Sequence, residues 1–325
     1  MACPPFEFLW IVKESSYQTQ FAAPVAGTDS IYIRLAGPNR FGMRPVPTKR
    51  KVAFGGGFAS PGYAVSDQWA IAGNLELELC YSQAQMLLDW AITPVNAGKT
   101  LPWVQTSEPP CDLASCTVYH GIQRDDGTIK RTRYLGVKVP TVKITSSEPA
   151  GLTMLSLGLR AAKMDANAYY ASSDPDASAF PAPADTVFPT DAVLFIHTLN
   201  QFKIGGSVVT YPQSLDLNID NHLDPLFFNS PFLLIDRKRG RSATASASLL
   251  YTATPNWRAD FEALTSRAAV FGWANGTNTI TINYQGNNLL DTIADDLTPG
   301  KVYDQTVTWE YQRDTSAGDI TFTYA

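Results

Sequence analysis

Two stretches of this chain carry the same pattern. Residues 75–82 read Leu-Glu-Leu-Glu-Leu-Cys-Tyr-Ser, and residues 245–252 read Ala-Ser-Ala-Ser-Leu-Leu-Tyr-Thr. Each alternates with the period of a β-strand and runs into a short helical pattern. Roughly sixty residues later a second pair of segments matches, 141–144 with 306–309, and each is followed by a glycine and an apolar strand at 152–159 or 320–324. The repeat predicts two copies of one β-rich module, and two unrelated amphipathic β segments are the alternative.

The predicted fold class is mostly β, with two related modules that each hold one short helix. We place the first module at 1–164, with an N-terminal arm and long loops, and the second at 193–325. Residues 165–192 are rich in Ala, Ser, Asp and Pro, and they predict a linker between the modules.

The local patterns predict further elements. Helices are expected around 83–91 and 256–270, where helical spacing follows a strand. The Gly-, Pro- and base-rich residues 37–66 are expected to form an exposed, flexible connection, and 94–120 a second long loop. A closing hairpin is expected over 303–324.

Composition excludes several classes of function. The chain has 325 residues, 45 % of them hydrophobic and 17 % charged, with a formal net charge of −5. A protein that grips nucleic acid usually carries a basic excess, which is missing here. Few charges and many Ser, Thr, Asn and Gln suit a β-protein that packs against many copies of itself. The N-terminus resembles no signal peptide and no segment is long enough to span a membrane, so we expect synthesis in the cytosol.

No residue pattern predicts catalysis, a metal or a cofactor. The histidines lie far apart in the sequence: His120, His197 and His222. Cys80 lies in a strand pattern and is expected in the core. Cys111 and Cys116 match no zinc spacing, so free thiols are favoured over a local disulfide. The sequence therefore favours a non-enzymatic protein.

Two strands keep acidic residues on one face. Glu76 and Glu78 alternate with leucines, and Asp216 and Asp220 alternate with Leu and Ile. One face must be buried, and the opposite face is wet and acidic. An ordinary solvated sheet face explains this pattern, and so does the wall of a channel for a polyanion, where like charge prevents adhesion.

Two basic clusters are candidate contacts between subunits. The first is Lys49, Arg50 and Lys51; the second is Arg237, Lys238, Arg239 and Arg241. Such clusters are solvated loop tips, or they meet acidic residues of a neighbouring subunit.

The order of these segments resembles one known family. The resemblance rests on the opening 13–19 (Lys-Glu-Ser-Ser-Tyr-Gln-Thr), the strand and helix at 71–91, residues 134–139 (Tyr-Leu-Gly-Val-Lys-Val), 202–206 (Phe-Lys-Ile-Gly-Gly) and 215–221 (Leu-Asp-Leu-Asn-Ile-Asp-Asn). The chain resembles the tail tube (major tail) proteins of long-tailed bacteriophages. Gln18 departs from the family, in which glycine is common at this position.

The resemblance implies a structural virion protein, made in the cytoplasm of a bacterial host. Its subunits would form rings that stack into the tail tube, whose inner wall is a β-barrel through which genomic DNA passes without specific binding. Implied partners are further copies of the chain and the tail terminator, tape measure and distal tail proteins, with no membrane. The alternative is another virion β-protein: a tail terminator, a decoration protein or a carbohydrate-binding adhesin.

Barrel geometry connects the repeat to stoichiometry. About 24 strands give a backbone diameter near ~48 Å and leave roughly 30–35 Å for duplex DNA. If each module supplies four strands, as the family suggests, six modules close the ring. Two modules per chain then favour a trimer with pseudo-sixfold symmetry, and one lumen-lining module per chain would require a hexamer.

Overall fold

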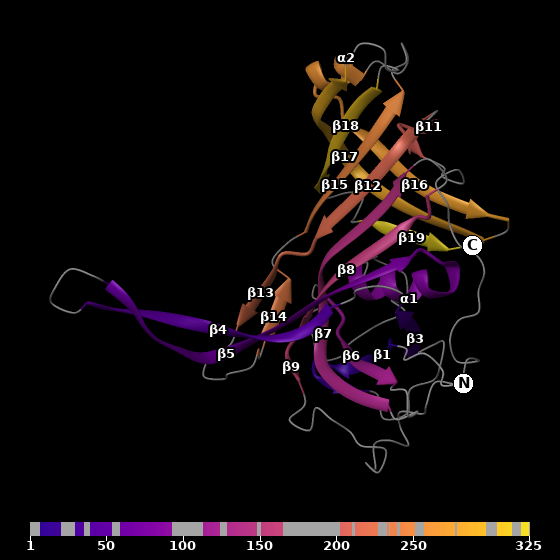
Figure 1. The fold of residues 1–325 in the computed structure, drawn as a ribbon. Helices are drawn as coiled ribbons and strands as arrows, with labels where there is room; N and C mark the ends of the chain where they lie inside the picture. Colours follow the sequence, from indigo (N-terminus) through magenta and orange to yellow (C-terminus); the bar gives the residue numbers. More distant parts are fainter. Residues whose placement is uncertain are drawn as a thin grey trace.

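The structure is a computed structural model, shown in Figure 1. It describes residues 7–20, 30–35, 40–53, 59–92, 113–123, 129–147, 151–164, 202–209, 212–226, 233, 235–238, 241–250, 257–276, 278–296, 304–313 and 320–324. The predicted linker at 165–192 lies outside these residues.

The fold is mostly β, as predicted. The described helices are α1 (Tyr81–Ile92) and α2 (Trp257–Glu262). The strands of the first half of the chain are β1 (Glu7–Ser16), β2 (Thr19–Gln20), β3 (Ser30–Leu35), β4 (Arg40–Ala53), β5 (Ala59–Glu78), β6 (Cys116–Gln123), β7 (Ile129–Ser147), β8 (Met154–Ala161) and β9 (Lys163–Met164). Those of the second half are β10 (Lys203–Ile204), β11 (Ser207–Val208), β12 (Pro212–Asp220), β13 (Leu223–Leu226), β14 (Ile235–Lys238), β15 (Ser242–Leu250), β16 (Arg267–Asn275), β17 (Asn278–Asp296), β18 (Asp304–Arg313) and β19 (Thr321–Tyr324).

One antiparallel sheet crosses both halves of the chain. Its eight strands follow one another in the order β4-β5-β8-β7-β12-β15-β18-β17. The link between the halves is the pair β7–β12, in which Thr141 lies opposite Asp220 and Ser147 opposite Ser214. We call this pair the seam.

Two long strands connect this sheet to further groups of strands. Over its first part β7 pairs with β6, which also pairs with β1, and β1 pairs with β3. In the same way β17 pairs over its first part with β16 and β19, and β16 pairs with β10. Each half of the eight-stranded sheet therefore continues into its own smaller group of strands.

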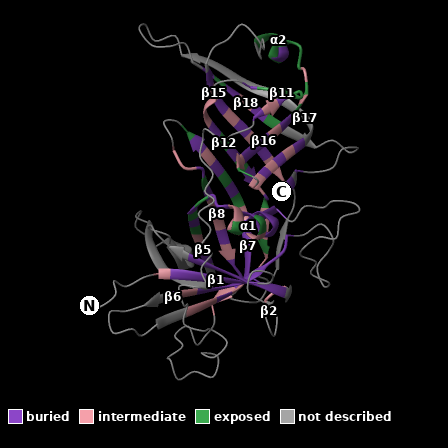
Figure 2. Cartoon of the chain, turned by 90° about the vertical axis from the view of Figure 1, so that its right-hand side faces the viewer, coloured by how far each residue is buried: buried purple, intermediate pink, exposed green. Residues whose placement is uncertain are grey.

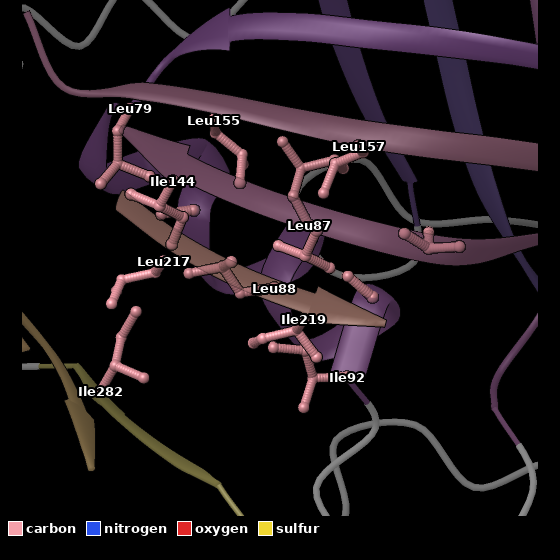
Figure 3. Close-up of a cluster of buried hydrophobic side chains, with 14 of the residues drawn as sticks. Leu79, Leu87, Leu88, Ile92, Ile144, Leu155, Leu157, Leu217, Ile219 and Ile282 are labelled. Atoms are coloured by element: carbon pink, nitrogen blue, oxygen red, sulfur yellow. The ribbon is translucent and has the colours of Figure 1, made fainter. Parts of the chain in front are cut away.

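The eight-stranded sheet has one apolar face, because leucine, isoleucine, valine and alanine alternate with polar residues along its strands. Leu75, Leu77 and Leu79 are buried, whereas Glu76 and Glu78 between them are exposed. Helix α1 covers this face, and Figure 3 shows Leu87 and Leu88 of the helix among the sheet side chains. The core is continuous between the halves, since Leu217, Ile219 and Ile282 belong to the same cluster.

Several sequence predictions are confirmed. The helix expected around 83–91 is α1, the strand expected at 152–159 is β8, and the predicted strand that carries Asp216 and Asp220 is β12. Cys80 is buried, as predicted.

Other predictions are wrong. The segment 37–66 is largely the hairpin of β4 and β5, in which Pro45 and Pro61 are tolerated because the hairpin has an edge strand without a second neighbour among the described strands. The loop predicted over 94–120 gives way to β6 from Cys116 onward. The helix predicted over 256–270 ends at Glu262, and the residues from Arg267 form β16, because an apolar run of this kind suits a buried strand as well as a helix. In place of the closing hairpin, the described residues of β18 and β19 both pair with β17 and not with each other.

The β4–β5 hairpin extends far from the body of the molecule (Figure 1). Strand β5 pairs with β8 only from Ile71 onward, whereas its residues from Ala59 to Ala70 pair only with β4 among the described strands. A two-stranded ribbon without further packing is marginally stable in water. The described strands of the chain therefore give the outer part of this hairpin no further pairing.

Candidate functional site

The polar face of the eight-stranded sheet gathers the predicted acidic residues. Residues that lie directly opposite each other on paired strands share a face. Counting across the sheet, one such row holds Glu76, Ser156, Lys143, Asn218, Thr244 and Glu310. The next row holds Glu78, Met154, Thr145, Asp216, Ser246 and Thr308.

Figure 2 shows this alternation as bands along β12, where buried residues alternate with exposed ones, and along β8, where they alternate mostly with half-buried ones. All four candidate acids, Glu76, Glu78, Asp216 and Asp220, lie on the polar face, three of them exposed and Asp220 half-buried. Asp216 forms a half-exposed ion pair with Lys143 (Nζ–Oδ1 3.5 Å). Most of the other side chains on this face carry a hydroxyl or an amide. The face is therefore polar, and its acidic residues outnumber its basic ones.

The two halves of the polar face differ in charge. In the first half Glu76 and Glu78 project from β5, and in the second half Ser246 and Ser248 occupy the corresponding positions of β15. The hydroxyl of Thr308 donates to or accepts from Ser246 at 3.1 Å. The acid is therefore concentrated in the first half and at the seam.

The seam is held by a polar clamp that sequence reasoning did not find. The Asn221 side chain is fully buried, and its amide nitrogen donates to the main-chain oxygens of Ala91 and Val139, both at 2.8 Å. Its Oδ1 accepts a hydrogen bond from Arg241 Nε, and Arg241 also donates to the oxygen of Ile92. The clamp satisfies carbonyls at the C-terminal end of α1, which have no partner within the helix.

The β13–β14 hairpin also joins the halves. Leu233, which follows β13, is buried and donates its main-chain N–H to the oxygen of Ala162 at 3.2 Å. Arg160 donates to the oxygen of Leu223 at 3.2 Å, and Gln18 Nε2 donates to the oxygen of Leu233 at 3.3 Å. The hairpin of the second half therefore lies against the first half.

The described members of the two basic clusters lie mainly on the hairpins β4–β5 and β13–β14. Lys49, Arg50 and Lys51 belong to β4, and Arg237 and Lys238 belong to β14. Arg239 lies outside the described residues. Arg241 differs from the others, because its guanidinium is engaged in the clamp of its own chain.

A buried carboxylate fixes the first turn of the chain. Glu14 Oε2 accepts hydrogen bonds from Ser115 Oγ and from the main-chain nitrogen of Gln18 at 2.8 Å, and Oε1 accepts from Thr117 Oγ1 at 2.9 Å and from the nitrogen of Gly136 at 2.8 Å. Burial raises the pKa of Glu14, and these four hydrogen bonds offset part of that effect.

Gln18 stands at the turn that this carboxylate organises. Its φ is 66°, in the left-handed region that favours glycine, and the same position of the turn between β10 and β11 holds Gly206 at φ 81°. The position at which glycine is common in the family thus needs a left-handed residue. Glu14 and Leu233 hold the backbone and side chain of Gln18 in this conformation.

The described residues contain no group of three or more His, Cys, Asp or Glu that could hold a metal ion. His120 contacts Glu7, and His222 contacts Ser242 and Asp220. Cys80 and Cys116 are free and buried, and burial raises the pKa of the Cys116 thiol well above its usual value. Cys111 and His197 lie outside the described residues. Within the described part of the chain, no helix has the length and apolar character needed to cross a membrane.

Comparison with known proteins decides the family. The family model for phage tail tube proteins matches residues 7–311. The chain belongs to the phage tail tube protein family. A search of curated proteins finds no match. This tail tube protein is therefore a structural component of the virion, and its family implies self-assembly into the tube and association with other tail proteins.

For a tail tube protein, the relevant surfaces are those that meet other copies of the chain and those that meet the contents of the tube. The polar sheet face and the hairpins are the candidate surfaces of this kind in the described residues. Alternation along single strands pointed to the face. The seam and the Glu14 site depend on contacts between residues far apart in the sequence, for which a single sequence carries no local signal.

Proposed function

We propose that this tail tube protein carries two copies of one module, and that three chains close a ring of pseudo-sixfold symmetry. The observation that carries the proposal is the repeated strand order. In the sheet, the four strands β4-β5-β8-β7 are followed by the four strands β12-β15-β18-β17. In each set of four, the second strand (β5 or β15) is followed along the chain by a helix. This order supports the repeat of 75–82 and 245–252.

The match between 141–144 and 306–309 in the sequence does not agree with the strand order. The residues at 306–309 lie in β18, which pairs with β15, whereas those at 141–144 lie in β7, which does not pair with β5. By strand order β18 corresponds to β8, and β17 to β7. The sequence match therefore paired 141–144 with the strand next to its true counterpart.

The strand count favours three chains per ring. Three copies of the eight-stranded sheet supply about 24 strands, which is the number that leaves roughly 30–35 Å for duplex DNA. Rings of this size would stack through the hairpins and their basic clusters, at residues 49–51 and 237–239. The tail terminator, tape measure and distal tail proteins are the proposed partners at the ends and inside of the tube.

In this arrangement the polar sheet face lines the channel. Its acidic excess repels the phosphates of DNA, and its hydroxyl groups offer no strong binding site, so DNA passes without adhering. The apolar face cannot take this role, because α1 and the core cover it.

Cryo-EM of tubes assembled from the purified chain tests the ring. We expect three chains per ring with both halves of each chain on the lumen. Strict sixfold symmetry with only one half of each chain on the lumen would contradict the proposal.

Charge reversal tests the channel. Phage carrying Glu76→Lys and Glu78→Lys should form intact tails but eject DNA more slowly, because lysine side chains on the wall attract phosphate. Glu262→Lys on the exposed side of α2 is the matched control and should leave ejection unchanged. Equal ejection by both variants, with normal tails, would show that the polar face does not meet DNA.

A further inference from the structure

The outermost strands of the eight-stranded sheet are β4 and β17, and each has an edge that pairs with no described strand. Strand β4 pairs with β5 on one side, and no other described strand pairs with its second edge. At the other end, residues 289–296 of β17 pair with β18, and their second edge has no partner among the described strands. Unpaired edges of this kind are templates for pairing with another chain.

We infer that β4 of one chain pairs with residues 289–292 of β17 in the next chain, in the antiparallel register that β12 and β7 already show at the seam. The occupant of the β17 edge is thus a second copy of this chain. The inference rests on the proposed function, because it uses the correspondence between the two modules.

The correspondence between the modules assigns a counterpart to Gly42, near the start of β4. The alignment of 75–82 with 245–252 equates Ala72 of β5 with Ser242 of β15. Ala72 lies opposite Gly42, and Ser242 lies opposite Asp220. Gly42 in β4 therefore occupies the place that Asp220 occupies in β12.

At the seam, the neighbours of Asp220 are known. Asp220 lies opposite Thr141 of β7, and Thr141 lies opposite Gly158 of β8. Gly158 in turn lies opposite Asn74 of β5. One row of directly opposite residues thus crosses from the first module into the second: Asn74, Gly158, Thr141 and Asp220.

The same series in the second module ends at the open edge. Thr244, the counterpart of Asn74, lies opposite Glu310, and Glu310 lies opposite Leu289 of β17. Leu289 therefore occupies the place of Thr141, and the residue that should face it is Gly42 of the next chain. Arg40 lies two residues before Gly42 in β4, so in an antiparallel pair it faces a residue after Leu289. That residue should be Thr292, because the irregularity between Leu290 and Thr292 adds one residue to β17.

The hairpins agree with this direction. At the seam, the β13–β14 hairpin of the second module lies against the first module through Leu233, Leu223 and Gln18. The β4–β5 hairpin leaves the first module at the corresponding point of the sheet, and its outer part pairs with no other strand among the described residues. Across the new pair of strands it would lie against the second module of the next chain.

Engineered disulfides test the register. Residues directly opposite on antiparallel strands have Cα atoms about 4.5–5.5 Å apart, which is within the Cα separation that a disulfide spans. Tubes of Arg40→Cys/Thr292→Cys should yield covalent dimers and trimers under oxidising conditions, with no larger species because the ring closes at three chains. Reduction should return them to monomers.

Three controls make the result specific. Asn218→Cys/Lys143→Cys is the corresponding pair at the seam and should form a disulfide within one chain, without covalent oligomers. Arg40→Cys/Ala294→Cys is out of register by two residues and should form none. The wild type and the single variants measure crosslinking through the native cysteines.

Tubes that form normally without crosslinks in Arg40→Cys/Thr292→Cys, or with equal crosslinks in the out-of-register pair, would overturn this inference and leave the proposed function standing. A wild-type chain that forms no tubes or rings would overturn the proposed function itself. If the double variant does not fold, a mixture of the two single variants should give dimers only. Backbone amides of 289–292 in the wild type should also gain protection from hydrogen exchange on assembly, and unchanged exchange would count against the pairing.

Discussion

Arg241 donates a hydrogen bond from Nε to Oδ1 of Asn221 across 2.9 Å, and this contact orients the Asn221 amide toward two main-chain carbonyls. All the hydrogen-bonding groups of a buried side chain are thus used at the point where the two halves of the sheet meet. Substitution of Asn221 measures how much this clamp contributes to the free energy of unfolding, apart from the surrounding apolar core.

Asn221→Ala should lower the free energy of unfolding by about 2–3 kcal/mol, because it leaves the oxygens of Ala91 and Val139 and the Arg241 guanidinium short of partners. Asn221→Asp should cost at least as much, since a carboxylate oxygen would then face those carbonyls. Urea unfolding of the purified chain measures both. Asn218→Ala, at an exposed position of β12 three residues before Asn221, is the control and should change stability little. Equal unfolding midpoints for Asn221→Ala and the wild type would show that the clamp is dispensable.

Glu14→Gln should destabilise the chain by about 1–3 kcal/mol. Each Glu14 oxygen accepts from a main-chain N–H, Gln18 on one side and Gly136 on the other. A glutamine amide presents only one oxygen, so one of these N–H groups would face another donor in either orientation. Thermal unfolding beside Glu78→Gln, an exposed substitution of the same kind, measures the effect. A loss no larger than that of the control would argue against the buried carboxylate as an anchor.

Asp89 of α1 should make the stability of the chain depend on pH. Burial raises its pKa to about 6 from an ordinary value of 3.8, and the charge of Lys13 and the Tyr324 hydroxyl counteract part of this rise. The folded chain therefore holds the proton more tightly than the unfolded chain, and this contribution is lost as pH rises from about 4 to about 6.

The wild type should accordingly lose on the order of 2 kcal/mol relative to Asp89→Asn between pH 4 and pH 7. Unfolding midpoints of the two chains, measured side by side across this range, give the difference. Other titrating groups, Glu14 among them, are present in both chains and cancel. Parallel curves for the two chains would mean that Asp89 does not titrate in this window.

Gly136→Ala and Gly276→Ala separate backbone strain from crowding. Their φ angles are 63° and 64°, but a Cβ at Gly136 would lie 2.9 Å from Ala162 Cβ and from Gln18 Cγ, whereas nothing lies within 4 Å at Gly276. Gly276→Ala should therefore cost about 1–2 kcal/mol for the left-handed conformation alone. Gly136→Ala should cost clearly more, because the neighbouring side chains and backbone must also shift. Similar losses in both variants, measured by thermal unfolding, would exclude crowding at Gly136.

Sequence reasoning succeeded where the determining interactions are local. Alternation of Leu75, Leu77 and Leu79 with glutamates identified both the strand and its buried face, because side chains alternate across a strand whatever it pairs with. The resemblance to tail tube proteins gave the family.

It failed where strand formation depends on a distant partner. Residues 37–66 carry the glycines and prolines of a loop, and only pairing between β4 and β5 makes them a hairpin. The run from Arg267 has no period that separates helix from strand, so the extent of α2 was overestimated. Asn221 and Glu14 gave no signal because their partners lie up to 130 residues away in the sequence.

The seam also changes how assembly responds to the amount of protein. In a ring of three such chains, every second joint between modules is already made inside a chain, at an effective concentration that tethering holds far above that of free subunits. Only the remaining joints are bimolecular. Ring formation should therefore depend on the third power of chain concentration, whereas six separate modules would impose the sixth, and tubes could begin to grow while the protein is still scarce in the infected cell.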